Sequence, residues 1–130
     1  MLWVQLVTLL AIVQFFFFGL LVGRSRVRQN VPAPATTGDP LFERYFRVHM
    51  NTLETLVLLL PSLWIAGSLW SPHWAAGIGA VYLLGRQVYL REYVREPRRR
   101  SLGYALSAGP AMLLLLAALG GVAHGLLVGS

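Results

Sequence analysis

The sequence of 130 residues contains no cysteine. It can form no disulfide, and it offers no thiolate as a nucleophile or metal ligand. Lysine is absent as well, so all 11 basic residues are arginines, against 5 acidic residues and a formal net charge of +6. Any thiol chemistry at this protein therefore requires a thiol that arrives with a ligand.

Charge of either sign is scarce. Only 12% of the residues are charged, whereas 56% are hydrophobic and the mean hydropathy is +0.61. This composition lies outside the range of soluble globular domains and is typical of proteins of the lipid bilayer. A pI near 10.8 would suggest a nucleic-acid partner in a soluble protein, but here it indicates membrane orientation, and we predict no nucleic-acid partner.

Four long apolar segments predict an all-α integral membrane protein, a four-transmembrane-helix bundle in one domain over residues 1–130. The helices are expected at about residues 2–23, 40–70, 72–96 and 101–129, with a polar, proline-rich loop over residues 23–40. Asp39 before Pro40, and Ser71 before Pro72, are helix-start signals, while Pro97 ends the third helix. Pro61 and Pro110 are expected to kink the helices that contain them.

The arginines are distributed unevenly along the chain. All of them fall in or beside the first and third loops, whereas the second loop and both termini carry no charged side chain. The positive-inside rule places those two loops in the cytoplasm and both termini on the opposite side. The arginine-only basic set, with its richness in Ala, Leu and Gly, favours a GC-rich bacterial genome and hence a multi-pass protein of the bacterial inner membrane.

Polar side chains recur at helical spacing within two apolar helices. One set is Arg47, Asn51 and Glu54, and the other is Tyr82, Arg86, Tyr89 and Tyr93. An arginine or glutamate facing lipid costs at least about 2.5 kcal/mol, so Glu54 and Arg86 are expected to face other helices, a cavity or each other. One interpretation is an interhelical Arg86–Glu54 ion pair that fixes packing.

The other interpretation is a ligand site. The remaining guanidinium, amide and phenol groups suit a small anionic, amide-rich ligand, and they belong to Arg47, Asn51, Tyr89 and Tyr93. Tyr82 is instead expected in the aromatic belt at the membrane interface. His49 lies beside the polar stripe. His73 and His124 have no partner at metal-ligand spacing, so no metal site is predicted.

Two motifs carry a resemblance to a known family. The segment TTGDPLFERYFRVHMNTLE (residues 36–54), followed by GRQVYLREY (residues 85–93), resembles the MAPEG family, membrane-associated proteins in eicosanoid and glutathione metabolism. LVGRSRVR before the first loop extends the match, which covers essentially the whole chain in order and spacing. The nearest branch is the microsomal glutathione transferase two and leukotriene C4 synthase group, in a bacterial-type version.

The resemblance implies a homotrimer of four-helix subunits that holds glutathione, its co-substrate, between neighbouring subunits. Arg100 falls at the position of the arginine that activates the thiol. The matching glutathione-binding positions are Arg26, Arg47, His49, Asn51, Glu54, Tyr89 and Tyr93. A free thiol titrates near pH 8.5, and a guanidinium that lowers this pKa by one unit must favour the thiolate by about 1.4 kcal/mol. Arg98 and Arg99 are ordinary topology signals or lipid contacts.

Two positions depart from the leukotriene synthase pattern. Thr55 stands in place of a tyrosine ligand, and Val27 in place of a second catalytic arginine, although Arg26 and Arg28 flank it. We therefore expect a glutathione transferase, with possible peroxidase activity, acting on lipophilic electrophiles or lipid hydroperoxides. The alternatives are a non-catalytic lipid-binding scaffold, like the five-lipoxygenase-activating protein, and a small multidrug transporter.

Overall fold

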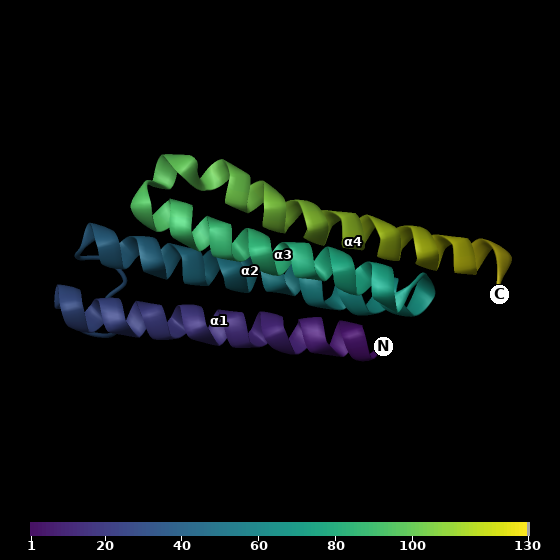
Figure 1. Ribbon diagram of the computed structural model, residues 1–130, viewed down its shortest axis with the longest axis horizontal. Helices are drawn as coiled ribbons and strands as arrows, with labels where there is room; N and C mark the ends of the chain where they lie inside the picture. Colours follow the sequence, from purple (N-terminus) through teal and green to yellow (C-terminus); the bar gives the residue numbers. More distant parts are fainter. Residues whose placement is uncertain (130) are drawn as a thin grey trace.

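The computed structural model describes residues 1–129 and consists of four long helices joined by short connections (Figure 1). The elements in chain order are α1 (Leu2–Gln29), α2 (Pro40–Leu69), α3 (Pro72–Arg95), a 3-10 turn η1 (Pro97–Arg99) and α4 (Arg100–Val128). Helix α1 packs against α2 and α3, while α4 packs against α3 and α2. The predicted all-α four-helix bundle is confirmed.

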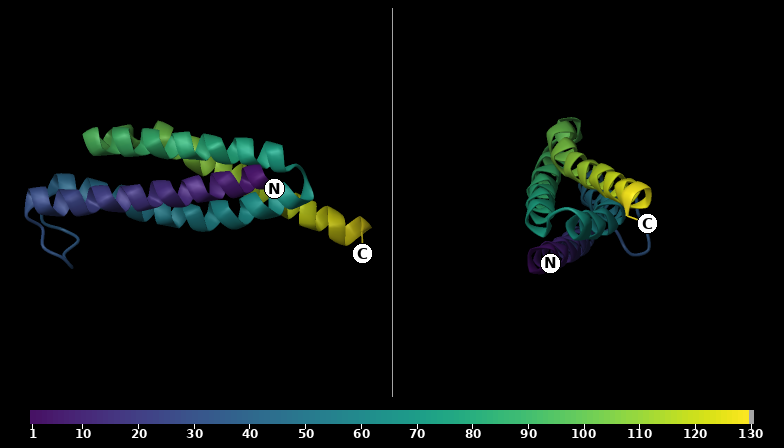
Figure 2. Two further views of the ribbon diagram at one scale, coloured as in Figure 1. Left: turned by 60° about the horizontal axis from the view of Figure 1, so that its bottom comes forward. Right: turned by 90° about the vertical axis from the view of Figure 1, so that its right-hand side faces the viewer.

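Both chain termini lie at the same end of the bundle (Figure 1). The connection between α1 and α2 and the turn between α3 and α4 lie together at the other end. That end carries the arginines of the chain, so we call it the arginine end. Figure 2 shows that the C-terminal part of α4 extends beyond the other three helices.

Helix starts and stops follow local side-chain chemistry. The Asp39 carboxylate accepts a hydrogen bond from the backbone N–H of Phe42 at 2.9 Å, and Ser71 Oγ accepts one from Trp74 N at 3.3 Å. Each cap satisfies one otherwise unpaired N–H of a helix first turn, and a proline follows each cap because it needs no hydrogen-bond acceptor there. The predicted starts at residues 40 and 72 are confirmed. Both α2 and α4 continue through their internal prolines, Pro61 and Pro110.

The first helix is longer than the sequence predicts. The expected loop over residues 23–40 is wrong in its first part, because α1 continues through the arginine-rich segment to Gln29 and ends at Asn30 in a left-handed conformation. Arginine and glutamine are good helix formers, and polarity alone does not stop a helix that has left the membrane. Arg24, Arg26 and Arg28 are consequently ordered on a helix.

Three helical segments are long and apolar enough to cross a membrane: Leu2–Gln29, Pro40–Leu69 and Pro97–Val128. Helix α3 has 24 residues, about 36 Å, but its second half carries charged side chains that lower its hydropathy. It packs against α4, α2 and α1. Arg86 is buried among these helices, whereas Arg91 and Arg95 are exposed toward the arginine end. The molecule is an integral membrane four-helix bundle.

Helices α3 and α4 approach each other very closely near the arginine end. A Cβ atom placed on Gly103 would lie 2.4 Å from Tyr89 Cα, and one on Gly85 would lie 2.5 Å from the Leu106 carbonyl. Only glycine fits at both contacts, as is common where membrane helices pack tightly. This contact sets the distance between the side chains of α3 and those of α4.

Tyr82 does not lie in an interfacial belt, so that expectation is wrong. Its side chain is fully buried, and its hydroxyl lies 2.7 Å from Thr55 Oγ1 on α2. A buried phenol requires a hydrogen-bond partner, and Thr55 supplies it inside the bundle. Tyr82 therefore points at α2 rather than at the membrane surface.

Candidate functional site

A cavity of about 560 Å³ opens between α2, α3 and α4 near the arginine end. Its lining brings together five of the predicted site residues and two others: Arg47, Asn51, Tyr89, Tyr93, Arg100, Ser101 and Tyr104. The volume lies in the range of small-molecule sites in proteins. We call this space the arginine–tyrosine cavity.

Each of the three helices contributes side chains one turn apart. Helix α2 presents Arg47 and Asn51, α3 presents Tyr89 and Tyr93, and α4 presents Arg100 and Tyr104. Residues at i and i+4 lie on one helix face. The cavity therefore forms where three short stripes of side chains come together, and the spacing within each stripe can be recognised in the sequence of its own helix.

The aromatic wall of the cavity is formed by phenol rings that are tilted relative to one another. The ring centroids of Tyr89 and Tyr93 lie 5.4 Å apart, and those of Tyr89 and Tyr104 lie 6.2 Å apart. Tyr89 is buried, whereas Tyr104 is exposed. The wall offers hydroxyl donors and a partly apolar surface, a combination that suits a ligand with both charged and aliphatic parts.

Arg86 forms the floor beneath this wall and is completely buried. Its Nη1 donates to Asn51 Oδ1 at 2.7 Å, and its Nη2 donates to Ser107 Oγ at 2.7 Å. The guanidinium also lies 4.3 Å from the centroid of the Tyr89 ring. Arg86 thus fixes the amide of Asn51 and supports the ring of Tyr89.

Two hydroxyl groups are oriented so that they accept from Arg86. Thr52 Oγ1 donates to Val48 O at 2.7 Å, and Ser107 Oγ donates to Gly103 O at 2.8 Å. Each hydroxyl has one proton, and both protons are used on the helix backbone, so the lone pairs remain for the guanidinium. This arrangement joins α2, α3 and α4 directly below the cavity.

The predicted ion pair between Arg86 and Glu54 is not formed. Arg86 contacts positions 51 and 52 of α2, and Glu54 is exposed at the surface. A helix turns about 100° per residue, so Glu54 lies about 60° around α2 from Asn51, on the side away from Thr52. Across residues 1–129 the ion pair found is Arg99 with Glu92, at 4.0 Å.

Arg100 is the first residue of α4, so its guanidinium lies beside the N-terminus of that helix. Its Nη1 donates to Pro97 O at 3.3 Å, and the side chain is otherwise exposed. Among residues 1–129 no side chain caps this helix start. The first-turn N–H groups and the arginine therefore create a positive potential at one corner of the cavity, which favours an anion there.

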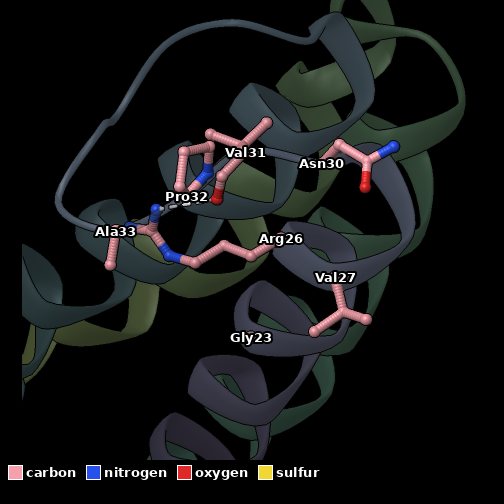
Figure 3. A pocket seen from close by; sticks show the side chains of 7 residues that line it. All are labelled: Gly23, Arg26, Val27, Asn30, Val31, Pro32 and Ala33. Carbon is pink, nitrogen blue, oxygen red and sulfur yellow. Dashed lines mark hydrogen bonds between the residues drawn. The ribbon is translucent and has the colours of Figure 1, made fainter.

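Arg26 lies outside the arginine–tyrosine cavity. It reaches from α1 toward the loop that follows, where its Nη1 lies 3.5 Å from Val31 O (Figure 3). The same nitrogen donates to Ala35 O at 2.7 Å. A second, more open cavity of about 570 Å³ lies beside it and is lined also by Val27 and Asn30. Arg26 holds the loop and lines a different cavity from Arg47.

His49 is also separate from the arginine–tyrosine cavity. Its ring stacks on Phe15 with a centroid distance of 4.4 Å, and it lines a groove on α1 together with Gly19. The structure therefore places the predicted ligand residues in three locations. Arg47, Asn51, Tyr89, Tyr93 and Arg100 meet in one cavity, whereas Arg26 and His49 lie on the α1 side and Glu54 on the outer surface.

Sequence reasoning missed Ser101 and Tyr104 as cavity residues. Tyr104 stands four residues after Arg100, the same spacing that identified the other stripes, so the signal was present in the sequence. Within residues 1–129 no group of three His, Cys, Asp or Glu residues is placed to hold a metal ion. The cavity accordingly offers arginine, amide and hydroxyl groups, which are donors for an organic anion.

Comparisons with known proteins match the chain along most of its length. The sequence profile of the MAPEG family matches residues 4–120. Human microsomal glutathione S-transferase 2 is 39% identical over 115 residues, which are 88% of this chain and 78% of the human protein. Leukotriene C4 synthase of Cavia porcellus is 40% identical over 119 residues, 91% of this chain and 79% of that protein. An uncharacterized protein of Synechocystis sp. is 42% identical over 119 residues, 92% and 87% of the two chains.

Proposed function

Because this chain belongs to the MAPEG family, we propose that it is a glutathione transferase of the membrane. Its relatives include proteins named microsomal glutathione S-transferase 2 and leukotriene C4 synthase. The observation that carries the proposal is the arginine–tyrosine cavity, which gathers Arg47, Asn51, Tyr89, Tyr93 and Arg100 from three helices. Their chemistry suits the carboxylates, amides and thiol of a tripeptide.

Arg100 and the start of α4 act on the thiol. The thiolate is the reactive form, and a guanidinium beside a helix N-terminus favours it over the neutral thiol. Lowering the thiol pKa by one unit requires about 1.4 kcal/mol of preference for the anion. Arg47 and the amide of Asn51, which Arg86 orients, bind the peptide part of glutathione.

The reaction is a nucleophilic displacement. The thiol releases its proton to solvent, and the sulfur lone pair forms a bond to an electrophilic carbon while the leaving group, such as chloride, departs with the bonding electrons. With a lipid hydroperoxide, two glutathione molecules are oxidised to the disulfide, and the peroxide is reduced to an alcohol and water. The lipophilic second substrate enters from the bilayer, which surrounds the apolar helices.

The complete glutathione site lies between neighbouring subunits of a homotrimer. The division of the family positions supports this arrangement, because Arg26 and His49 lie away from the cavity that holds Arg47. In a cyclic trimer the α1 side of one subunit meets the cavity of the next. Glu54, which is exposed on the single subunit, also gains a neighbour in this arrangement.

Membrane orientation follows from the arginine end. We place this end, and therefore the glutathione site, on the cytoplasmic side of a bacterial inner membrane, with both termini on the opposite side.

Two positions differ from the leukotriene C4 synthase pattern. An exposed valine, Val27, stands in place of its second catalytic arginine, and Thr55, which is hydrogen-bonded to Tyr82, stands in place of its tyrosine ligand. A transferase with broad acceptance of electrophiles, and with peroxidase activity, fits these two departures.

Calorimetric titration of glutathione into the detergent-solubilised protein tests the proposal. Wild type is expected to bind glutathione, and Arg47→Ala is expected to weaken binding about tenfold or more, because a charge-assisted hydrogen bond is lost. Arg91→Ala removes the same charge from the exposed surface outside the cavity and is expected to bind as wild type does. Wild type that binds no glutathione at millimolar concentration would refute the function.

A conjugation assay with an aryl halide separates an enzyme from a lipid-binding scaffold. Arg100→Ala is expected to reduce the rate about tenfold or more at saturating glutathione, since the thiolate loses its nearest guanidinium. Arg98→Ala, an exposed arginine of the same turn, is the matched control and is expected to retain the rate. Equal rates in wild type and Arg100→Ala would exclude the assigned catalytic role of Arg100.

A further inference from the structure

A third cavity, smaller than the two already described, lies between α1 and the start of α2 at the arginine end. Its volume is about 120 Å³, and its lining consists of Leu21, Arg24, Ser25, Arg28, Gln29, Leu41 and Tyr45. It shares no residue with the arginine–tyrosine cavity or with the cavity beside Arg26. We call it the α1–α2 cavity.

Ser25 provides the strongest sign that this cavity takes a ligand. Its side chain is 4% exposed, and its hydroxyl oxygen has no hydrogen-bond partner among residues 1–129. Serine hydroxyls within helices normally bond to a backbone carbonyl of the preceding turn, as Ser107 does. A buried hydroxyl without a partner destabilises the fold, unless something else in the cavity bonds to it.

Two arginines stand beside this hydroxyl without partners of their own. Arg24 and Arg28 are one helical turn apart, and neither forms an ion pair or a hydrogen bond within the described part of the chain. Arg26, Arg44 and Arg86, in contrast, each donate to protein oxygens. Gln29 and the Tyr45 phenol add two further donors to the same lining. This donor set matches a phosphate group, which accepts several charge-assisted hydrogen bonds.

The lining also changes in character along α1. Leu21 and Leu41 form its apolar part, whereas Arg28 and Gln29 lie about 10–12 Å further along the helix from Leu21. Residues before Leu21 belong to the apolar span, so the cavity lies where hydrocarbon gives way to the polar face. A free phosphate ion would gain no favourable contact from the two leucines. A phospholipid, in contrast, presents both its phosphate and its glycerol and acyl carbons at this depth.

We propose that the α1–α2 cavity binds the phosphate headgroup of an anionic phospholipid from the leaflet at the arginine end. Arg24 and Arg28 pair with the phosphate, Ser25 donates to one phosphate oxygen, and the leucines contact the glycerol and upper acyl chain. The site is independent of glutathione, and its occupancy links α1 to α2 at the point where they leave the membrane.

Native mass spectrometry of the assembled protein, with added lipid, tests the assignment. Wild type is expected to retain phosphatidylglycerol in preference to phosphatidylcholine. Arg24→Gln with Arg28→Gln is expected to weaken this retention about tenfold or more, since each arginine near the surface contributes about 1 kcal/mol to anionic lipid binding. Arg98→Gln with Arg99→Gln removes two charges from the same end, outside the cavity, and is expected to retain the lipid as wild type does.

Ser25→Ala separates a built site from a diffuse positive surface, because the net charge stays the same. We expect Ser25→Ala to lose phosphatidylglycerol retention while unfolding in phosphatidylcholine at the same temperature as wild type or higher. Equal losses in the two double variants, or unchanged retention in Ser25→Ala, would overturn the proposal. Displacement of the lipid by inorganic phosphate alone would instead assign the cavity to a free anion and would also overturn it.

Discussion

At the scale of single residues, the arginines of this chain have the same side-chain chemistry but different structural roles. Arg44 donates to the carbonyls of Val94 and Arg95 at 3.0 and 3.3 Å, and so satisfies the C-terminal end of α3. Arg26 holds the loop after α1. Arg86 is buried and joins three helices, whereas Arg47 and Arg100 face the cavity with free donors.

Arg86 is a positioning residue, and its replacement tests this role. Arg86→Lys keeps the charge but cannot reach both Asn51 and Ser107 with a planar fork, so the Asn51 amide and the Tyr89 ring lose their support. We expect KM for glutathione to rise about fivefold or more, whereas kcat changes less because Arg100 is not bonded to Arg86. Steady-state kinetics at saturating electrophile measure both constants.

A purely structural role for Arg86 predicts a different result. It would lower the amount of folded protein without changing KM, so thermal unfolding of wild type and Arg86→Lys must be recorded at the assay temperature. A KM equal to that of wild type in folded Arg86→Lys would show that Asn51 and Tyr89 do not depend on this guanidinium.

At the scale of the elements, the contact between α3 and α4 determines the width of the arginine–tyrosine cavity. Tyr89 and Tyr93 project from α3, and Arg100 and Tyr104 project from α4. Gly103 lies directly against the backbone of Tyr89. Any side chain at position 103 would separate the two helices at the cavity itself.

Gly103→Ala is therefore expected to destabilise the protein and impair the site together. The added methyl group would lie 2.4 Å from Tyr89 Cα, and such overpacking costs about 1–3 kcal/mol. Gly109→Ala is the matched control on the same helix, because nothing lies within 4 Å of its added Cβ. Thermal unfolding in detergent is expected to show a loss for Gly103→Ala and an unchanged or slightly raised stability for Gly109→Ala. Equal unfolding temperatures of the two variants would contradict the close contact.

At the scale of the whole molecule, large apolar side chains are exposed along α1, α2 and α4, as expected of helices that face lipid or other subunits. The predicted ligand residues are divided between two faces of this surface, with Arg47 in one cavity and Arg26 beside another. The site that we propose between subunits would make this division functional, and mixing variants tests it.

Co-assembly of Arg26→Ala and Arg47→Ala subunits tests the shared site. Each variant alone is expected to have little activity, because every site lacks one arginine. In a mixed trimer, an Arg26→Ala subunit still contributes Arg47 and its Arg47→Ala neighbour still contributes Arg26, so one of the three sites is complete. Since about three quarters of the trimers in a random equal mixture are mixed, about one quarter of all sites are complete. Conjugation by the co-expressed protein is expected to recover to about one quarter of wild type. No recovery in verified mixed trimers would place both arginines at sites within one subunit.

The sequence by itself determined the helices and much of their chemistry. Composition predicts a membrane bundle, because so apolar a chain cannot fold as a soluble domain, and caps such as Asp39 and Ser71 act within one helical turn. The stripe positions Arg47, Asn51, Tyr89 and Tyr93 were likewise readable, because a helix brings i and i+4 together whatever surrounds it. These are local properties of the chain.

Only the tertiary structure decided which stripes meet. The partner of Arg86 is Asn51 rather than Glu54. Which residue of α2 faces Arg86 depends on the rotation of α2 about its axis relative to α3, and the sequence of one helix does not contain that rotation. Tyr82 is buried rather than interfacial for the same reason. Such features arise from helices that are distant in sequence, so no periodicity within one segment contains them.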